Sequence, residues 1–320
     1  MTAVLNRKTA ILAALTLLSA LAYQFLFMDP ELFGIFMEIR APKLCAMVIA
    51  ALCIGGSSLV FQTLINNTIV TPCLLGMNSL YLLIHTALVG VFGAASFAVT
   101  DKHLSFVVDL CLMAVVASFI YSYIFKKTKY NVLYVLLIGT VMTTMFTSMQ
   151  NTIVRAMDPN DYDTLLTTLV ASFTNMNSSV LAMAMVLIVV LYFAFRKDLA
   201  LLDVMTLGKQ QSISLGIDYD RTVRRLLVFV TLYIAIATAL IGPISFMGLI
   251  TTNIARQYFQ TYRHRYLIWG SIFISVVILV AGQTLVERVF TYSIPVSVFI
   301  TIGGGIYFLY LVLRASKGSI

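Results

Sequence analysis

The sequence has very little charge for its length. Charged residues make up 11% of its 320 residues, whereas hydrophobic residues make up 60%. Soluble domains carry roughly 25% charged residues, so this chain lacks the charge needed to cover a water-soluble globule. The shortage excludes an ordinary soluble enzyme, a disordered chain and a nucleic-acid-binding domain. Long apolar runs without the alternation of a membrane barrel predict an all-α, polytopic membrane protein that contacts lipid.

The sequence also lacks the residue patterns that carry most catalytic and metal chemistry. Its four cysteines and three histidines are scattered, so they form no cluster with metal-ligand spacing. Neither a glycine-rich phosphate loop nor a hydrolase or zinc-protease motif occurs. We therefore expect no catalytic residue, no cofactor and no metal site, and any ATP hydrolysis must come from another protein.

Ionisable residues are scarce inside the apolar runs. Asp109 lies near the start of one run, and we expect its side chain to reach the outer interface. A proton-driven secondary carrier usually contains buried acidic or histidine residues, which cost about 2.5–3.5 kcal/mol each on insertion scales. Their scarcity disfavours such a carrier, and it disfavours a membrane enzyme acting on lipids even more.

The apolar runs divide the chain into about ten membrane helices within a single domain that covers residues 1–320, since each helix needs about 20 apolar residues. The run after Gly242-Pro243 is too short for a full crossing, so we expect it to be a short eighth helix. The expected spans are approximately 9–28, 44–63, 74–95, 104–125, 132–153, 180–195, 226–241, 246–258, 267–286 and 296–313.

Basic residues indicate the orientation of these helices. If both termini are cytoplasmic and the eighth helix is a half-length one, most lysines and arginines fall in cytoplasmic loops, as the positive-inside rule requires. The sequence therefore predicts a multi-pass protein with both termini in the cytoplasm. The clusters on that side include Lys126-Lys127, Arg196-Lys197, Arg224-Arg225 and Arg263-His264-Arg265.

The fifth expected span carries many neutral polar residues. Spacings of three and four residues place five of them on one helical face, and three methionines interleave with them. Such a face either packs against another helix or lines a polar path that a bulky solute can follow, and the sequence leaves both open. The polar residues are Thr140, Thr143, Thr144, Thr147 and Asn151, and the methionines are Met142, Met145 and Met149.

Two glycine-rich stretches lie within other spans. Gly55-Gly56-Ser57-Ser58 belongs to the second span, and Gly303-Gly304-Gly305 belongs to the tenth. Small residues let helix backbones approach each other in a membrane. We expect both stretches to mark close helix packing.

One long polar stretch, residues 196–225, interrupts the apolar pattern. Within it, Leu207-Gly208 and Leu215-Gly216 bracket a short amphipathic segment, and glycines at these positions suit helix ends. Two short helices joined by glycine would form a compact cytoplasmic knob. Such a knob either lies on the lipid headgroups or inserts into a groove of a soluble partner.

Several other stretches share an order and a spacing over most of the chain. They are Arg40-Ala41-Pro42-Lys43; the series Gln62, Asn67, Pro72, Leu75 and Gly76; the turn 242–250 followed by Arg256; and Ile294-Pro295-Val296 with Ile302-Gly303. Together with the polar stretch they resemble the iron-siderophore and vitamin B12 family of ABC importer permeases. Departures from the residues usual in that family indicate a divergent branch, at Thr68, Lys209, Thr252-Asn253, Gln283 and Ser293.

The resemblance implies a transport subunit rather than an enzyme. It implies the permease of a binding-protein-dependent ABC transporter that imports ferric siderophore across the bacterial cytoplasmic membrane. The implied partners are cytoplasmic ATP-binding subunits, a second permease subunit, identical or homologous, and an extracytoplasmic solute-binding protein. Vitamin B12 or haem is the alternative cargo within the family, and a self-sufficient secondary carrier is the alternative outside it.

The resemblance also implies roles for particular residues. The segment from Leu207 to Gly216 would couple the permease to the ATPases, and the fifth and tenth helices would line the path. External cations would dock acidic residues of the binding protein, although snorkelling at the interface is an alternative and Glu287 could neutralise its neighbour Arg288. The external cations are Arg40, Lys43 and Arg288.

Overall fold

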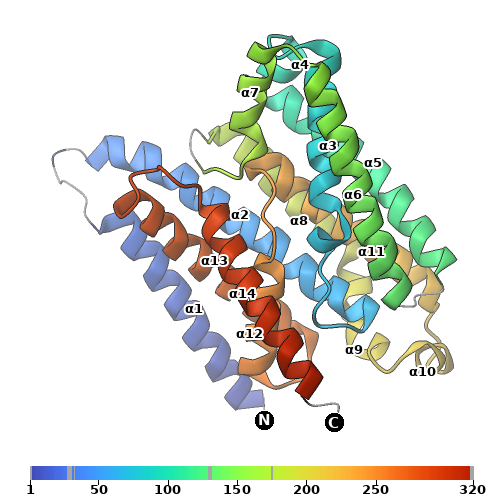
Figure 1. Ribbon diagram of the computed structural model, residues 1–320. Coiled ribbons are helices and arrows are strands. Elements are labelled where there is room, and N and C mark those ends of the chain that lie inside the picture. The colour runs from blue at the N-terminus through green and yellow to red at the C-terminus, as the bar shows by residue number, and fades with distance from the viewer. Residues whose placement is uncertain (1, 27–30, 32, 129–131, 174–175, 318–320) are drawn as a thin grey trace.

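The computed structural model describes residues 2–26, 31, 33–128, 132–173 and 176–317, and over this part of the chain it contains helices and no strand (Figure 1). The prediction of an all-α protein is confirmed. Met28 and Asp29, at the expected end of the first span, lie outside the described residues. The helices are α1 (Thr2–Phe25), α2 (Phe33–Ile65), η2 (Pro72–Leu75), α3 (Met77–Phe92), α4 (Phe97–Thr100), α5 (Lys102–Lys127), α6 (Val132–Ala156), α7 (Pro159–Leu169), α8 (Ser178–Ala200), α9 (Leu202–Met205), α10 (Lys209–Ser214), α11 (Tyr219–Ile241), α12 (Met247–Phe259), α13 (His264–Arg288) and α14 (Val296–Lys317).

Six of the described helices are long and apolar enough to cross a membrane, namely α1, α2, α5, α8, α11 and α13. Helix α3 and the part of α14 from Val296 to Leu311 are also apolar, but each is shorter than 18 residues. The 13-residue α12 is the short eighth helix that the sequence predicts. The chain is therefore a multi-pass membrane protein, and its expected spans correspond in order to α1, α2, α3, α5, α6, α8, α11, α12, α13 and α14.

The two ends of the helix bundle carry different parts of the chain. Figure 1 shows both termini at one end, together with α9 and α10. It shows α4 and α7 at the opposite end. The termini and the polar stretch 196–225 therefore share one side, as the distribution of basic residues predicts.

Helix α2 lies at the centre of the bundle, where it contacts α1, α8, α11, α12 and α13. Small residues make this possible. A side-chain carbon added at Gly55 would lie 2.6 Å from the Ser275 hydroxyl of α13, and the Ser271 hydroxyl donates to the Gly55 carbonyl at 3.0 Å. Helices α2 and α12 also approach each other closely, because a carbon added at Gly248 of α12 would lie 2.6 Å from Cβ of Ser58 in α2. Close packing at the first glycine-rich stretch is confirmed.

The second glycine-rich stretch behaves differently. A carbon added at Gly304 would lie 2.3 Å from Cβ of Phe246, so α14 packs closely there. Gly303 and Gly305 have no atom within 4 Å of such a carbon. The expectation of close packing is therefore wrong for these two glycines within this chain, since they lie on the side of α14 that the chain leaves open.

Two element boundaries differ from the sequence expectation. Helix α2 begins at Phe33 rather than after Lys43, so it contains Pro42 in its interior. Residues 159–169, which lie between the expected spans 132–153 and 180–195, form α7. Asp158 caps this helix by accepting from the backbone N–H of Asn160 at 2.9 Å, and Pro159 occupies its first position. An acidic cap followed by proline is a helix-start pattern, so the sequence did contain the signal.

Candidate functional site

The polar face expected on the fifth span lies on α6, and most of it is not covered by this chain. Thr140, Thr144 and Thr147 are exposed, and Met145 and Met149 are 43% and 49% exposed. Asn151 is exposed as well. A hollow of about 410 Å³ on this face is lined by Thr140, Val141, Thr144, Met145 and Ser148.

Thr143 and Met142 differ from the rest of this face. Both are half-buried. Thr143 lies against Gly76, the left-handed residue between η2 and α3, so closely that a side-chain carbon there would lie 2.9 Å from its hydroxyl. Met142 packs against the main hydrophobic core. The residues that the sequence places on one face are therefore divided between a packed edge and an open one.

The hydroxyl groups of the exposed threonines bond within α6. Thr140 donates to the Leu137 carbonyl at 2.8 Å, Thr144 to the Thr140 carbonyl at 3.0 Å, and Thr147 to the Thr143 carbonyl at 2.9 Å. The Thr147 hydroxyl also lies 3.4 Å from the Ser79 hydroxyl of α3, but each of the three threonines already has a carbonyl acceptor within α6. Packing accounts for Thr143, while the open edge presents methyl, hydroxyl and thioether groups outward.

The polar stretch 196–225 contains the last turn of α8, the two short helices α9 and α10, and the start of α11. We call residues 202–216 the knob. Gly208 and Gly216 have φ angles of +96° and +84°, which side chains adopt only with strain. The expected pair of short helices with glycine at their ends is confirmed.

The knob has an apolar outer surface and a buried inner one. Leu207, Ile213 and Leu215 are 56%, 53% and 63% exposed. Leu202 and Met205 are buried in the core on the other side. Three exposed aliphatic side chains on a segment of fixed shape suit insertion into an apolar environment, either the groove of a partner or the headgroup region.

Hydrogen bonds hold the knob together. The buried Ser212 hydroxyl donates to the Val204 carbonyl at 3.1 Å and thereby joins α10 to α9. The Lys209 ammonium lies 2.8 Å from the Asp220 carboxylate, which joins α10 to α11. Helix α10 is therefore connected to both α9 and α11.

Arg40 belongs to α2 and is 5% exposed, and its side chain lies against the last residues of α1. Its Nη1 donates to the carbonyls of Tyr23, Gln24 and Leu26, each at 3.1 Å. The last carbonyls of a helix lack partners within the helix, and a cation there also interacts favourably with the helix dipole. These contacts within the chain account for the buried cation without a binding protein, so its docking role stays a prediction.

Lys43 is also buried, at 6% exposure. Its ammonium lies 3.3 Å from Glu287 of α13 and donates to the Tyr292 hydroxyl at 2.9 Å. The same carboxylate oxygen of Glu287 accepts from Tyr23 and Gln283, each at 2.9 Å. Glu287 therefore pairs with the buried Lys43, whereas the neighbouring Arg288 is exposed. Arg288 and Arg40 line one hollow of about 430 Å³ between α1 and α13.

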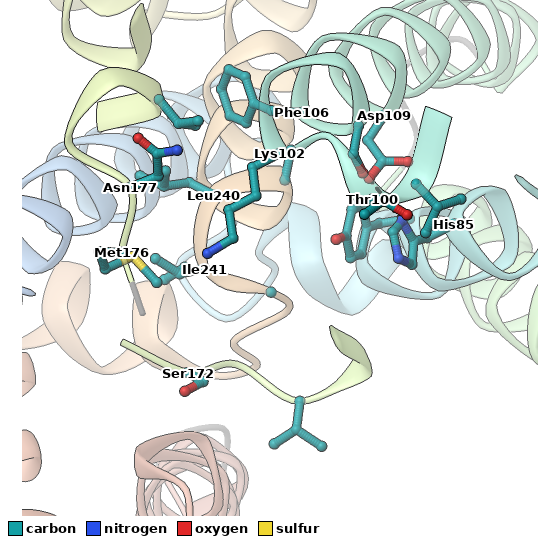
Figure 2. Close-up of a pocket in the computed structure, with 17 residues that line it drawn as sticks. His85, Thr100, Lys102, Phe106, Asp109, Ser172, Met176, Asn177, Leu240 and Ile241 are labelled. Carbon is teal, nitrogen blue, oxygen red and sulfur yellow. Dashed lines mark hydrogen bonds and ion pairs between the residues drawn. The ribbon is translucent and has the colours of Figure 1, made fainter. Parts of the chain in front are cut away.

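A cavity of about 560 Å³ lies between the start of α5, the end of α11 and the segment that precedes α8. Figure 2 shows Lys102 extended into this cavity, with Asn177 and Met176 to one side and Ser172 below. Asp101 is the residue before α5 and caps the start of this helix. The backbone N–H groups of Leu104 and His103 donate to its carboxylate and hold its pKa below the ordinary value.

One wall of this cavity contains a buried ionisable pair. His85 of α3 and Asp109 of α5 are 5% and 2% exposed, and Nδ1 lies 2.8 Å from Oδ2. The expectation that Asp109 reaches the outer interface is therefore wrong, because its side chain turns into the bundle toward His85. No sequence pattern predicts this pair, since its members lie on different helices and neither belongs to a motif.

Comparison with known proteins places this arrangement in a family. The model of the FecCD transport family matches residues 7–314. The chain belongs to the FecCD transport family. Within it, the chain is 39% identical to the petrobactin import system permease protein YclO of Bacillus subtilis, over 92% of this chain and 93% of that protein. It is 33% identical to the petrobactin import system permease protein FatC of Bacillus anthracis, over 86% and 78%.

A solved structure agrees with the fold. A metal-chelate type ABC transporter in an inward-facing conformation superposes with a TM-score of 0.79 over 97% of this chain and 99% of that chain. The two sequences are 17% identical, so the likeness establishes the shared fold of this FecCD-family chain.

Proposed function

We propose that this chain is the permease subunit of an ABC importer that moves a ferric siderophore of the petrobactin type into the cell. The observation that carries the proposal is identity of 39% and 33% to two petrobactin import permeases over most of the chain. These relatives favour a ferric siderophore over vitamin B12 or haem as the cargo. The knob supports the mechanism, because a permease without an ATP site needs a surface on which an ATPase can act.

In this proposal the knob is the docking surface for a cytoplasmic ATPase. Leu207 and Leu215 are exposed and project from a segment whose shape Gly208 and Gly216 fix. Aliphatic side chains on a rigid helix pair fit an apolar groove in a partner. Closure of two ATPases on ATP would then displace the knobs of two permease subunits, which are either identical or homologous.

The open edge of α6 would line the path between the two permeases. Its exposed threonines have satisfied hydroxyls, so they offer weak, exchangeable contacts to a hydrated solute. Its methionines are flexible and polarisable, which suits a surface that must accommodate a bulky chelate. On the far side from the knob, Arg288 is the exposed member of the three predicted docking cations, and it would contact the solute-binding protein.

The proposed location is the bacterial cytoplasmic membrane, with both termini in the cytoplasm. The side that bears the termini also bears the knob in Figure 1. An ATPase that hydrolyses cytoplasmic ATP must meet the knob on that side.

The proposal is tested by reconstitution. The chain is purified with its ATPase and second permease, placed in liposomes containing ATP, and supplied from outside with binding protein and radioiron-labelled ferric petrobactin. We expect uptake that requires ATP and binding protein, and no comparable uptake of vitamin B12 or haem. Uptake of another chelate alone would reject the cargo but keep the class.

One observation favours a second candidate, a secondary carrier. The buried His85–Asp109 pair is the kind of ionisable group that ion-driven carriers use. Uptake driven by a proton gradient in liposomes that contain this chain and no ATPase would support that candidate and reject the importer.

A further inference from the structure

Three residues from three separate elements form a continuous hydrogen-bonded link at the knob. Asp203 belongs to α9 in the knob, His264 is the first residue of α13, and Thr63 lies in the last turn of α2. The link therefore runs from the knob to α2 and α13, which pack against each other in the centre of the bundle.

His264 holds the middle of this link. One oxygen of Asp203 accepts from the backbone N–H of His264 at 2.8 Å and lies 2.6 Å from its ring Nδ1. The other ring nitrogen, Nε2, lies 2.9 Å from the Thr63 hydroxyl. The His264 side chain is 4% exposed, whereas the Asp203 side chain is 44% exposed. A single carboxylate of the knob thus fixes both the first backbone group of α13 and the orientation of the buried ring.

The link continues beyond Thr63. The neighbouring Gln62 donates to the Thr68 carbonyl at 2.7 Å, and Asn253 of α12 donates to the same carbonyl at 2.8 Å. The end of α2 is therefore also tied to α12. Displacement of Thr63 changes the place where α2, α12 and α13 meet.

We propose that His264 is a positioning residue that transmits displacement of the knob to the junction of α2 and α13. The inference rests on the proposed function, in which an ATPase moves the knob. Apolar contacts such as those of Leu202 can slide past one another. Two hydrogen bonds to one carboxylate oxygen instead couple the positions of Asp203 and His264. Asp203 cannot shift without moving the imidazole ring or breaking both bonds.

The test compares variants at both ends of the link in the complete transporter. Asp203→Ala removes the acceptor, whereas Asp203→Asn keeps an oxygen in the same place and serves as the conservative rescue. Thr63→Val removes the hydroxyl with little change of shape. The matched control is Thr231→Val on α11, since this buried hydroxyl donates to the Leu227 carbonyl of its own helix at 2.9 Å.

The first readout is the amount of ferric petrobactin transported per ATP hydrolysed. We expect Asp203→Ala and Thr63→Val each to lower this ratio by about fivefold, which is within the range for residues of a coupling network. Asp203→Asn and Thr231→Val should keep it near wild type. The double variant should lose no more than the worse single variant, because both changes act through His264. A wild-type ratio in both single variants, or losses that add, would overturn the inference.

The second readout needs no cargo. A cysteine placed at Thr144 reports the α6 face through its labelling rate with and without trapped nucleotide. In the wild-type background we expect nucleotide to change the rate, and in Thr63→Val we expect that change to disappear. If labelling responds to nucleotide while ferric petrobactin is not transported, the proposed cargo fails and the link is still tested. A response that Thr63→Val leaves intact would reject the link whatever the cargo.

Discussion

Helices α2 and α6 both carry small and hydroxyl-bearing residues at helical spacing, yet they use them in opposite ways. On α2, Gly55 and Ser58 are buried against α13 and α12. On α6, Thr140 and Thr144 are exposed and bond to their own helix. Small polar residues therefore bring backbones together in one helix and leave an uncovered polar surface in the other. The environment that surrounds these residues, rather than their type, decides whether they pack between helices or remain uncovered.

The largest expected effect is a loss of stability when the close packing of α2 is disrupted. In Gly55→Val, the added side chain meets the Ser275 hydroxyl at 2.6 Å and the Ser271 carbonyl oxygen at 3.1 Å. Overpacking of this kind costs about 1–3 kcal/mol or more, so we expect a lower melting temperature and less monodisperse protein in detergent. Thr144→Val on α6 is the matched change and should leave both unchanged. Equal loss of stability in the two variants would contradict the distinction between the helices.

The second effect concerns the buried cations at the outer end. Arg40→Ala leaves three carbonyls at the end of α1 without their donor. An unsatisfied buried group costs about 1–3 kcal/mol, so we expect a clear drop in thermal stability, and a smaller drop for Arg288→Ala, because Arg288 is exposed.

The rate at which the binding protein associates with the permease also distinguishes Arg288 from Arg40. Rim charges mainly govern encounter rate and salt dependence, so Arg288→Glu should slow association and flatten its dependence on salt. Surface plasmon resonance at low and moderate salt measures both quantities. If Arg40→Lys, which keeps the charge, slows association while the protein stays fully stable, Arg40 itself docks the binding protein.

A smaller effect on the fold, with a clear effect on transport, is expected at the knob. Gly216 has a φ angle of +84°, and no atom lies within 4 Å of an added side-chain carbon. Valine there is strained by about 1–3 kcal/mol, which should reshape the knob and lower uptake per ATP hydrolysed without loss of the inserted protein. Asparagine tolerates left-handed conformations, so Gly216→Asn should transport better than Gly216→Val. Equal transport in the two variants would remove the φ argument.

Much of the fold follows from the sequence because long apolar runs and basic clusters report directly on membrane crossing. The short α12 and the two glycines of the knob were predictable for local reasons, namely run length and helix-end chemistry. The contacts of Arg40, the His85–Asp109 pair and the Asp203–His264–Thr63 link were not. Each joins residues that lie far apart in the chain, and no local pattern specifies which helices become neighbours. For the same reason the sequence could not separate Thr143, which packs, from Thr144, which is exposed.

The most direct test of this account measures cysteine reactivity along α6 in the assembled transporter. The native cysteines are first replaced, because Cys45 and Cys111 are exposed. Single cysteines are then placed at Thr143, Thr144 and Thr147, with Phe119 of α5, which is 76% exposed, as a control for a lipid-facing position. We predict that cysteines at Thr144 and Thr147 react with a membrane-impermeant thiol reagent and change rate when nucleotide is trapped, while those at Thr143 and Phe119 stay slow. Inert cysteines at Thr144 and Thr147 in every nucleotide state would contradict the central claim and make the α6 face a packing surface.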